Sequence, residues 1–133
     1  MSLQTYERQL SRFAPEILSI LRIVTALLLL QHCFTKFFGF PGTMTAPATF
    51  SMIWWAGAIE LVGGILVLIG LFTRPAAFIL SGEMAFAYFI GHAPKGFYPL
   101  TNGGEPAVLF CFIFLYIAAA GAGPWSVDAT RGR

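Results

Sequence analysis

The sequence predicts an all-α integral membrane protein, a single antiparallel four-helix bundle over residues 1–133. Composition is the first reason, because 57% of the 133 residues are hydrophobic and only 11% are charged. A soluble domain has roughly 45–50% apolar residues and about 25% charged residues. The second reason is that the apolar residues fall into four long runs. These runs lack the alternation of apolar and polar residues that barrel strands require, and a helix satisfies its own backbone hydrogen bonds in lipid.

The same composition excludes several classes of protein. A net charge of +2 on a chain this apolar, with no basic run, fits neither a disordered chain nor a nucleic-acid-binding protein. The chain also lacks a phosphate-binding glycine motif, a nucleophile elbow and a cluster of metal ligands. We therefore expect no nucleic-acid partner, no metal site and no self-contained catalytic centre.

The expected helices cover about residues 17–38, 51–72, 76–90 and 105–122. A spanning helix takes roughly 20 mostly apolar residues, so the first two runs are long enough, the third is short and the fourth is borderline. Only Thr73, Arg74 and Pro75 separate the second run from the third, which predicts a tight antiparallel hairpin. Helix-breaking residues mark the other connections: Pro41, Gly42 and Pro47 after the first run, and Gly121, Gly123 and Pro124 after the last.

Basic residues near the ends of the runs predict the orientation. With the amino terminus inside, five arginines are cytoplasmic and two lysines are outside: Arg8, Arg12, Arg74, Arg131 and Arg133 against Lys36 and Lys95. Cytoplasmic segments carry an excess of Lys and Arg, so we expect both termini in the cytoplasm. The first sixteen residues mix both charge signs and precede a run too long for a signal peptide. The chain is therefore expected to be a multi-pass protein of the cell membrane, in contact with lipid.

Four ionisable residues fall inside the apolar runs, Arg22, His32, Glu60 and Glu83, and Lys36 lies at the end of the first run. Each costs about 2.5–3.5 kcal/mol to insert and by default marks a function. At a rise of ~1.5 Å per residue, both glutamates lie near the middle of the membrane on neighbouring helices, and Arg22 lies one to two turns from the cytoplasmic face. Two acids against one base suggest that one carboxyl group is protonated. Two interpretations stay open: an ion pair of Arg22 with either glutamate that sets helix register, or a proton relay or headgroup site.

A second polar group gathers toward the outer face. His32 and Lys36 are four residues apart and share a helix face, while His92, Asn102 and Glu105 lie in or beside the outer connection before the last run. Together they predict an outward-facing pocket able to hydrogen-bond a quinone carbonyl or a small anion. The alternative is that Lys36 only reaches to the membrane interface and that Glu105 only caps the last helix, where the helix dipole favours a carboxylate.

Other residues allow further interpretations. His32 and His92 could ligate a haem, but their unequal expected depths argue against haem as the cofactor. Cys33 and Cys111 both fall in the outer half; they either pair or act as small buried apolar residues. Small residues along the second run (Gly57, Gly63, Gly64 and Gly70) predict the close approach of another helix.

The order of these motifs resembles the DoxX family of small four-helix membrane proteins. The motifs are Arg22, H-C-F-T-K-F-F-G from His32 to Gly39, E-L-V-G-G from Glu60, G-L-F-T-R from Gly70 to Arg74, Glu83-Met84, His92, N-G-G-E from Asn102 to Glu105, and G-A-G-P-W-S-V-D ending at Asp128. The likeness covers roughly residues 18–128. Cys33 is a departure, because the family pattern usually has Gly after the histidine.

The resemblance implies a four-helix fold and a loose link to membrane redox systems, including thiosulfate:quinone oxidoreduction and complexes that resist thiol and oxidative stress. We expect an accessory subunit of a quinone-linked redox system, in which His32, Lys36, Asn102 and Glu105 bind a quinone or small oxyanion and Glu60 with Glu83 handle protons. A partner subunit or bound cofactor would carry the electrons. The alternatives are a non-catalytic subunit that assembles or stabilises a larger complex, and a small transporter built from a homo-oligomer.

Overall fold

The computed structural model describes residues 2–39 and 49–131, and every regular element in these ranges is helical. The elements are α1 (Leu3–Ser11), α2 (Ala14–Phe38), α3 (Met52–Ile69), α4 (Thr73–Ala87), a π-helical turn η1 (Tyr88–His92), a 3-10 turn η2 (Ala93–Lys95), α5 (Pro99–Asn102), α6 (Glu105–Ala120) and α7 (Val127–Thr130). The predicted all-α class is confirmed. Pro41, Gly42, Pro47 and Arg133 lie outside the described residues.

Three helical segments are long and apolar enough to cross a bilayer. They are α2 with 25 residues, α3 with 18, and the continuous stretch Thr73–Lys95 with 23. The third segment is longer than its apolar run because η1 and η2 continue α4 beyond residue 90. α6 has 16 residues, so the shortest of the four segments is the last one, whereas the sequence predicts that the third is the shortest.

Local signals explain where the helices begin and end. α2 starts at Ala14, earlier than its apolar run, because Pro15 stands in its first turn, where a missing N–H costs nothing. α3 ends at Ile69 rather than residue 72 because Gly70 adopts φ +74° and caps the helix in the left-handed conformation.

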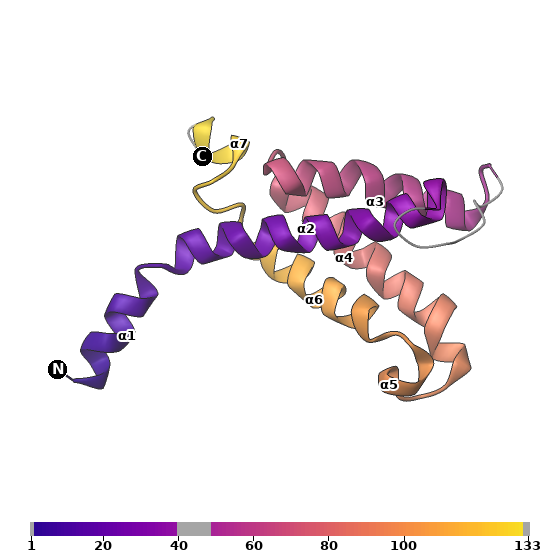
Figure 1. The fold of residues 1–133 in the computed structure, drawn as a ribbon, viewed down its shortest axis with the longest axis horizontal. Coiled ribbons are helices and arrows are strands. Elements are labelled where there is room, and N and C mark those ends of the chain that lie inside the picture. Colours follow the sequence, from indigo (N-terminus) through magenta and orange to yellow (C-terminus); the bar gives the residue numbers. More distant parts are fainter. Residues whose placement is uncertain (1, 40–48, 132–133) are drawn as a thin grey trace.

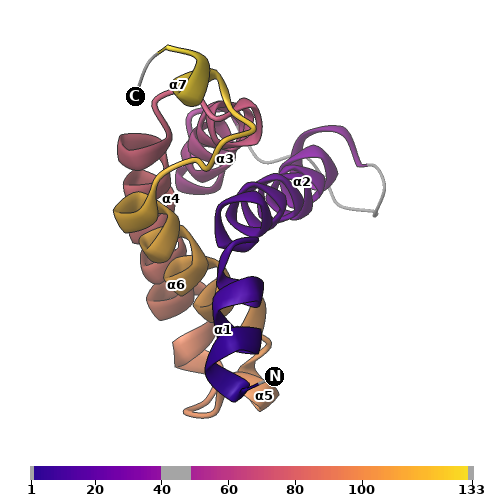
Figure 2. The same ribbon diagram turned by 90° about the vertical axis from the view of Figure 1, so that its left-hand side faces the viewer.

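The long helices pack as two pairs that share a core. α2 lies against α3 and α4 lies against α6, while α3 and α4 join the pairs (Figures 1 and 2). Apolar residues from all four helices form the core: Ala26 and Leu29, Val67, Ala77, Leu80 and Met84, and Phe110, Phe114 and Ile117. α5 lies at one end of this assembly, and α1 projects from it at the other (Figure 1).

Glycines allow α2 to approach α3 closely. A Cβ atom built on Gly57 would lie 2.7 Å from two ring atoms of Phe37, and one on Gly64 would lie 2.8 Å from a methyl group of Leu30. Small residues serve the same purpose in other membrane bundles. The predicted close approach along α3 is therefore present, and α2 is the helix that makes it.

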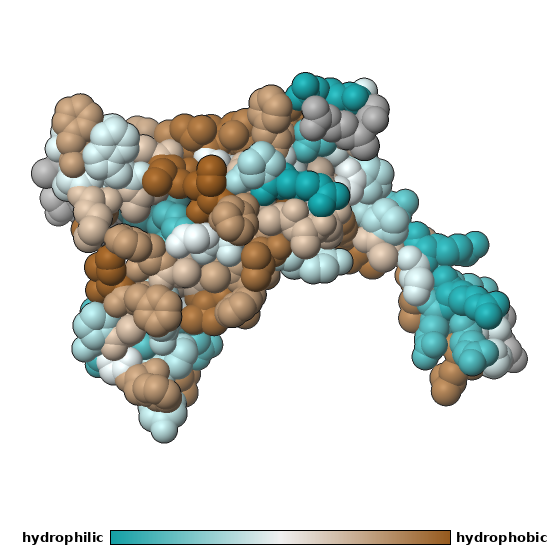
Figure 3. All heavy atoms as spheres, turned by 180° about the vertical axis from the view of Figure 1, so that it is seen from behind, coloured by the Kyte–Doolittle hydropathy of each residue, from teal (hydrophilic) through white to brown (hydrophobic). Residues whose placement is uncertain are grey.

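The outer surface of the bundle is apolar. Large side chains such as Val62, Phe78, Phe86 and Phe112 are more than half exposed. Figure 3 shows hydrophobic surface over much of the bundle and hydrophilic residues gathered on the projecting helix. Such a surface belongs in lipid, because soluble monomers rarely expose large contiguous apolar patches.

Candidate functional site

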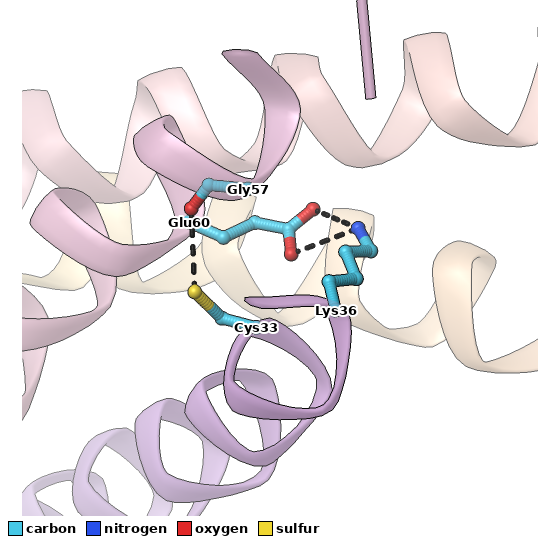
Figure 4. A network of polar contacts seen from close by, with 4 residues as sticks. All are labelled: Cys33, Lys36, Gly57 and Glu60. Carbon is cyan, nitrogen blue, oxygen red and sulfur yellow. Dashed lines mark hydrogen bonds and ion pairs between the residues drawn. The ribbon is translucent and has the colours of Figure 1, made fainter. Parts of the chain in front are cut away.

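A buried ion pair joins α2 to α3. Lys36, in the last turn of α2, donates from Nζ to both carboxylate oxygens of Glu60, at 3.1 Å and 3.0 Å (Figure 4). The Glu60 side chain is 2% exposed and the Lys36 side chain 23%. A charge buried this deeply needs a partner, and Lys36 supplies it. Lys36, and not Arg22, is therefore the base that pairs with Glu60.

The glycines of α3 and a cysteine of α2 set the geometry of this pair. Gly57 and Gly64 stand three residues before and four after Glu60, on the face that meets α2. Cys33, one turn before Lys36, is fully buried, and its Sγ donates to the Gly57 carbonyl at 3.3 Å (Figure 4). The small thiol therefore packs where the two backbones come close, directly beside the ion pair.

Glu83 of α4 brings a second carboxyl group to the pair. It lies within hydrogen-bonding reach of Glu60, and its Oε1 atom is buried without a hydrogen-bond partner among the described residues. The three side chains thus bring one ammonium group and two carboxyl groups together.

A cavity of about 170 Å³ opens next to this cluster. Four of the residues singled out from the sequence line it: His32, Lys36, Glu60 and His92. The rest of its wall is largely apolar and comes from Leu29, Met84, Ala87, Pro106, Ala107 and Phe110. The His32 ring stands edge-on to Phe110 with 6.0 Å between centroids. The structure therefore gathers polar residues from α2, α3 and η1 around one small space.

A larger groove of about 560 Å³ adjoins the cavity. Its lining is mostly apolar and includes Met52, Ile53, Trp55, Ala56, Ile59, Phe86 and Ile90, with Glu83 and Lys95 among the polar residues. Lys36, Ala87 and His92 line both spaces. The cavity and the groove are thus neighbours that share three lining residues.

Asn102 and Glu105 do not line the cavity. Asn102 is buried, and its amide donates to the Tyr88 hydroxyl at 3.1 Å and to the Gly96 carbonyl at 3.0 Å, while its oxygen accepts from Gly104 N at 2.8 Å. The Asn102 side chain therefore holds the connection together. The backbone carbonyl oxygen of Asn102 lies 3.2 Å from His92 Nδ1. Glu105 is exposed in the first turn of α6, where the helix dipole favours a negative charge.

Arg22 belongs to a different network near the ends of α3 and α6. The residue is 1% exposed, and its guanidinium group donates to the carbonyl oxygens of Ala122, Trp125 (2.7 Å) and Leu68 (3.4 Å). The carbonyls that follow a helix end have no intrahelical partner, so a buried arginine can satisfy several of them at once. Ser19, one turn earlier, accepts from Trp125 N at 3.1 Å.

Asp128, for which no role was expected, caps α4 from the segment that follows α6. Its carboxylate accepts from the backbone N–H groups of Phe72 and Thr73, both at 3.0 Å. The motif G-A-G-P-W-S-V-D was a usable signal, because Ser126 and Asp128 are polar residues that directly follow the last apolar run. The hydrogen bonds of Arg22 and Asp128 together hold the segment after α6 against the bundle.

The cysteines and metal ligands complete the description. Cys33 and Cys111 are both free thiols, and Cys111 contacts Ser81 instead. Among the described residues, no group of three or more His, Cys, Asp and Glu side chains is arranged to hold a metal ion.

Comparison with known proteins assigns the family. The DoxX family model matches residues 17–93, more than half of the chain. The chain belongs to the DoxX family. The matched region contains every polar residue that lines the cavity, whereas α1 and α6 lie outside it.

One relative of this DoxX protein is described as an uncharacterized protein of Haemophilus influenzae. It is 48% identical over 125 residues, which cover 90% of this chain and 93% of the relative. No protein of solved structure matches the chain. The family match and the apolar helices together show that this DoxX protein is a membrane protein, in contact with lipid.

Proposed function

We propose that this DoxX protein is an accessory subunit of a quinone-linked membrane redox system and that the cavity binds the quinone headgroup. The observation that carries the proposal is the shared wall: Lys36 and His92 line both the small polar cavity and the apolar groove. An isoprenoid quinone has a ring with two carbonyl acceptors and a long apolar tail, so it matches a polar space that adjoins an apolar one. Ligand sites are commonly apolar with a few well-placed polar groups.

The polar residues offer donors for the quinone carbonyl groups. An ammonium group has three N–H donors, and Glu60 takes two of those of Lys36. The third is available to a quinone oxygen at the cavity. His32 and His92 supply ring N–H groups for the second carbonyl group. Glu60 would act as a positioning residue that holds the Lys36 ammonium in place.

Glu60 and Glu83 would handle protons in this proposal. Reduction of a quinone to a quinol takes two electrons and two protons, and both electrons would come from a partner subunit or its cofactor. The Glu83 carboxyl group lies beside Glu60 and also lines the groove. It can therefore pass a proton to the quinone side of the cluster and be reprotonated afterwards.

The proposal includes a topology with four spans and both termini on the cytoplasmic side. Support comes from the two contacts that bring arginines to one end of the bundle. Arg74 donates to the Ala119 carbonyl at 2.5 Å, and Arg131 lies over the Phe72 ring with 5.2 Å to its centroid. The lysines Lys36 and Lys95 line the groove instead. By the positive-inside rule the arginine end faces the cytoplasm, which puts the cavity toward the outer face.

The test begins with purification of the native protein in a mild detergent. Mass spectrometry and an absorption spectrum then identify bound quinone, other cofactors and co-purifying subunits together. Binding is measured by titrating decylubiquinone and following fluorescence, because Trp55 lines the groove. We expect Lys36→Met to weaken binding about tenfold or more, since it removes a charged hydrogen-bond donor.

Glu105→Gln is the matched control, because Glu105 is exposed and lies outside the cavity lining. We expect this variant to bind decylubiquinone as the parent protein does. Absence of quinone in the native preparation, with equal titration curves for Lys36→Met and the parent, contradicts the proposal. A stoichiometric partner whose activity survives Glu60→Gln would favour a non-catalytic assembly subunit instead.

A further inference from the structure

We propose that α1 is an interfacial helix that lies on the surface of an anionic lipid bilayer. Its apolar residues form one stripe. Leu3, Tyr6 and Leu10 recur at helical spacing and Phe13 continues the line, with Leu3 79% and Leu10 70% exposed. The rest of the helix surface carries only polar and charged residues, with Gln4, Arg8 and Ser11 on the side opposite the stripe and Glu7 at its edge. A helix with this division of faces binds in the plane of a membrane interface.

The bundle does not cover this stripe. No residue of α1 is buried, and the helix projects away from the other helices (Figure 1). α1 has nine residues, and an isolated helix of that length is marginal in water. Ser2 caps it by accepting from Thr5 N at 3.2 Å, but a cap alone does not offset the cost of nucleation. The stripe therefore needs an apolar environment outside the bundle.

The neighbouring sequence identifies that environment as lipid. Only Arg12 and Phe13 separate α1 from Ala14, the first residue of a helix long enough to span the bilayer. Because an extended residue reaches at most ~3.6 Å, α1 is held at the level where α2 enters the membrane. Arg8 and Arg12 lie opposite the stripe on a helical projection, where they can contact anionic headgroups while the stripe enters the acyl boundary.

A second copy of the chain is a poorer occupant. A specific protein interface takes roughly 20–30 residues on each side, whereas the stripe offers four. Charge also favours lipid, since the two arginines of this segment, Arg8 and Arg12, outnumber its one glutamate, Glu7.

The test uses the full-length chain with its two cysteines replaced by alanine, reconstituted in vesicles of phosphatidylcholine and phosphatidylglycerol. Spin labels are attached at Leu3→Cys and Leu10→Cys on the stripe and at Gln4→Cys on the opposite face. Collision with oxygen, which concentrates in lipid, is compared with collision with a water-soluble nickel chelate. We expect the oxygen-to-nickel accessibility ratio to be several-fold higher at positions 3 and 10 than at position 4.

Each other outcome overturns the proposal. Equal ratios at the three positions, with ready access of nickel to all, would mean that α1 extends into water. Low accessibility to both reagents at positions 3 and 10 would mean that protein, from a second copy or a partner subunit, covers the stripe. An unchanged size-exclusion profile of each labelled chain confirms that the substitutions leave the bundle folded. The result is independent of quinone binding, since α1 contributes no residue to the cavity or the groove.

Discussion

Removing the two partners of the buried ion pair should have very unequal effects on the free energy of unfolding. Lys36→Met leaves the Glu60 carboxylate, with a side chain 2% exposed, without its counter-charge. Losing one partner of a buried pair costs about 3–5 kcal/mol. In Glu60→Gln the remaining charge is on Lys36, whose side chain is 23% exposed and flexible enough to move its ammonium group toward water. The expected cost there is about 1–2 kcal/mol, typical of a lost charged hydrogen bond.

The double variant Lys36→Met/Glu60→Gln leaves neither charge and should be more stable than Lys36→Met alone, with a coupling energy of about 2 kcal/mol. The measurement is reversible unfolding by sodium dodecyl sulfate in mixed micelles, followed by circular dichroism. Lys95→Met and Glu105→Gln are matched controls, because both side chains are exposed. Additive losses, or a larger loss for Glu60→Gln than for Lys36→Met, would refute the reasoning from burial.

Four further substitutions, one of them a control, test the supporting structure. Asp128→Ala removes the acceptor for Phe72 N and Thr73 N, and the lost helix cap should cost about 0.5–2 kcal/mol in the same unfolding assay. Gly57→Ala forces a Cβ atom to 2.7 Å from the Phe37 ring, whereas Gly82→Ala meets nothing within 4 Å. The first should destabilise the protein by about 1–3 kcal/mol, and the second should be neutral or stabilising by up to ~1 kcal/mol; equal melting temperatures would contradict this. Asn102→Ala leaves three hydrogen-bonding groups without their partner, so amide exchange around residues 96–104 should accelerate; unchanged exchange would show that the side chain does not hold this connection.

The helices were predictable because their signal is large. Long apolar runs need no knowledge of partners, and small residues along α3 already indicated a close neighbour. The predicted ends of the helices differ from the observed ends for local reasons. For example, Gly70 adopts the left-handed conformation and ends α3 before residue 72. The continuation of α4 through η1 and η2 had no comparable signal, because it depends on how the Asn102 amide holds the following connection.

The site was predictable in part. The depth of a side chain in the membrane could be predicted, but the helix that it faces could not. Sequence position gives the height of a residue along a spanning helix but not the neighbour that its side chain faces. Glu60 and Glu83 were placed at a similar depth, and they are in fact neighbours. Arg22 was offered as their base, yet it contacts backbone carbonyls elsewhere, while Lys36 reaches Glu60 because Gly57 and Cys33 let the two helices meet.

The arginine at the ends of α3 and α6 has a consequence for how the chain is made. Arg22 and the Ala122 carbonyl that it binds are 100 residues apart in sequence. At a synthesis rate of ~5–20 residues per second, the ribosome needs about 5–20 s to supply that acceptor after Arg22 has been made. During this interval the Leu68 carbonyl is available to the guanidinium group, but the Ala122 and Trp125 carbonyls have not been made. Arg22 therefore completes its hydrogen bonds late in synthesis, and a chain cut before Gly121 would lack two of the three carbonyl groups that it binds.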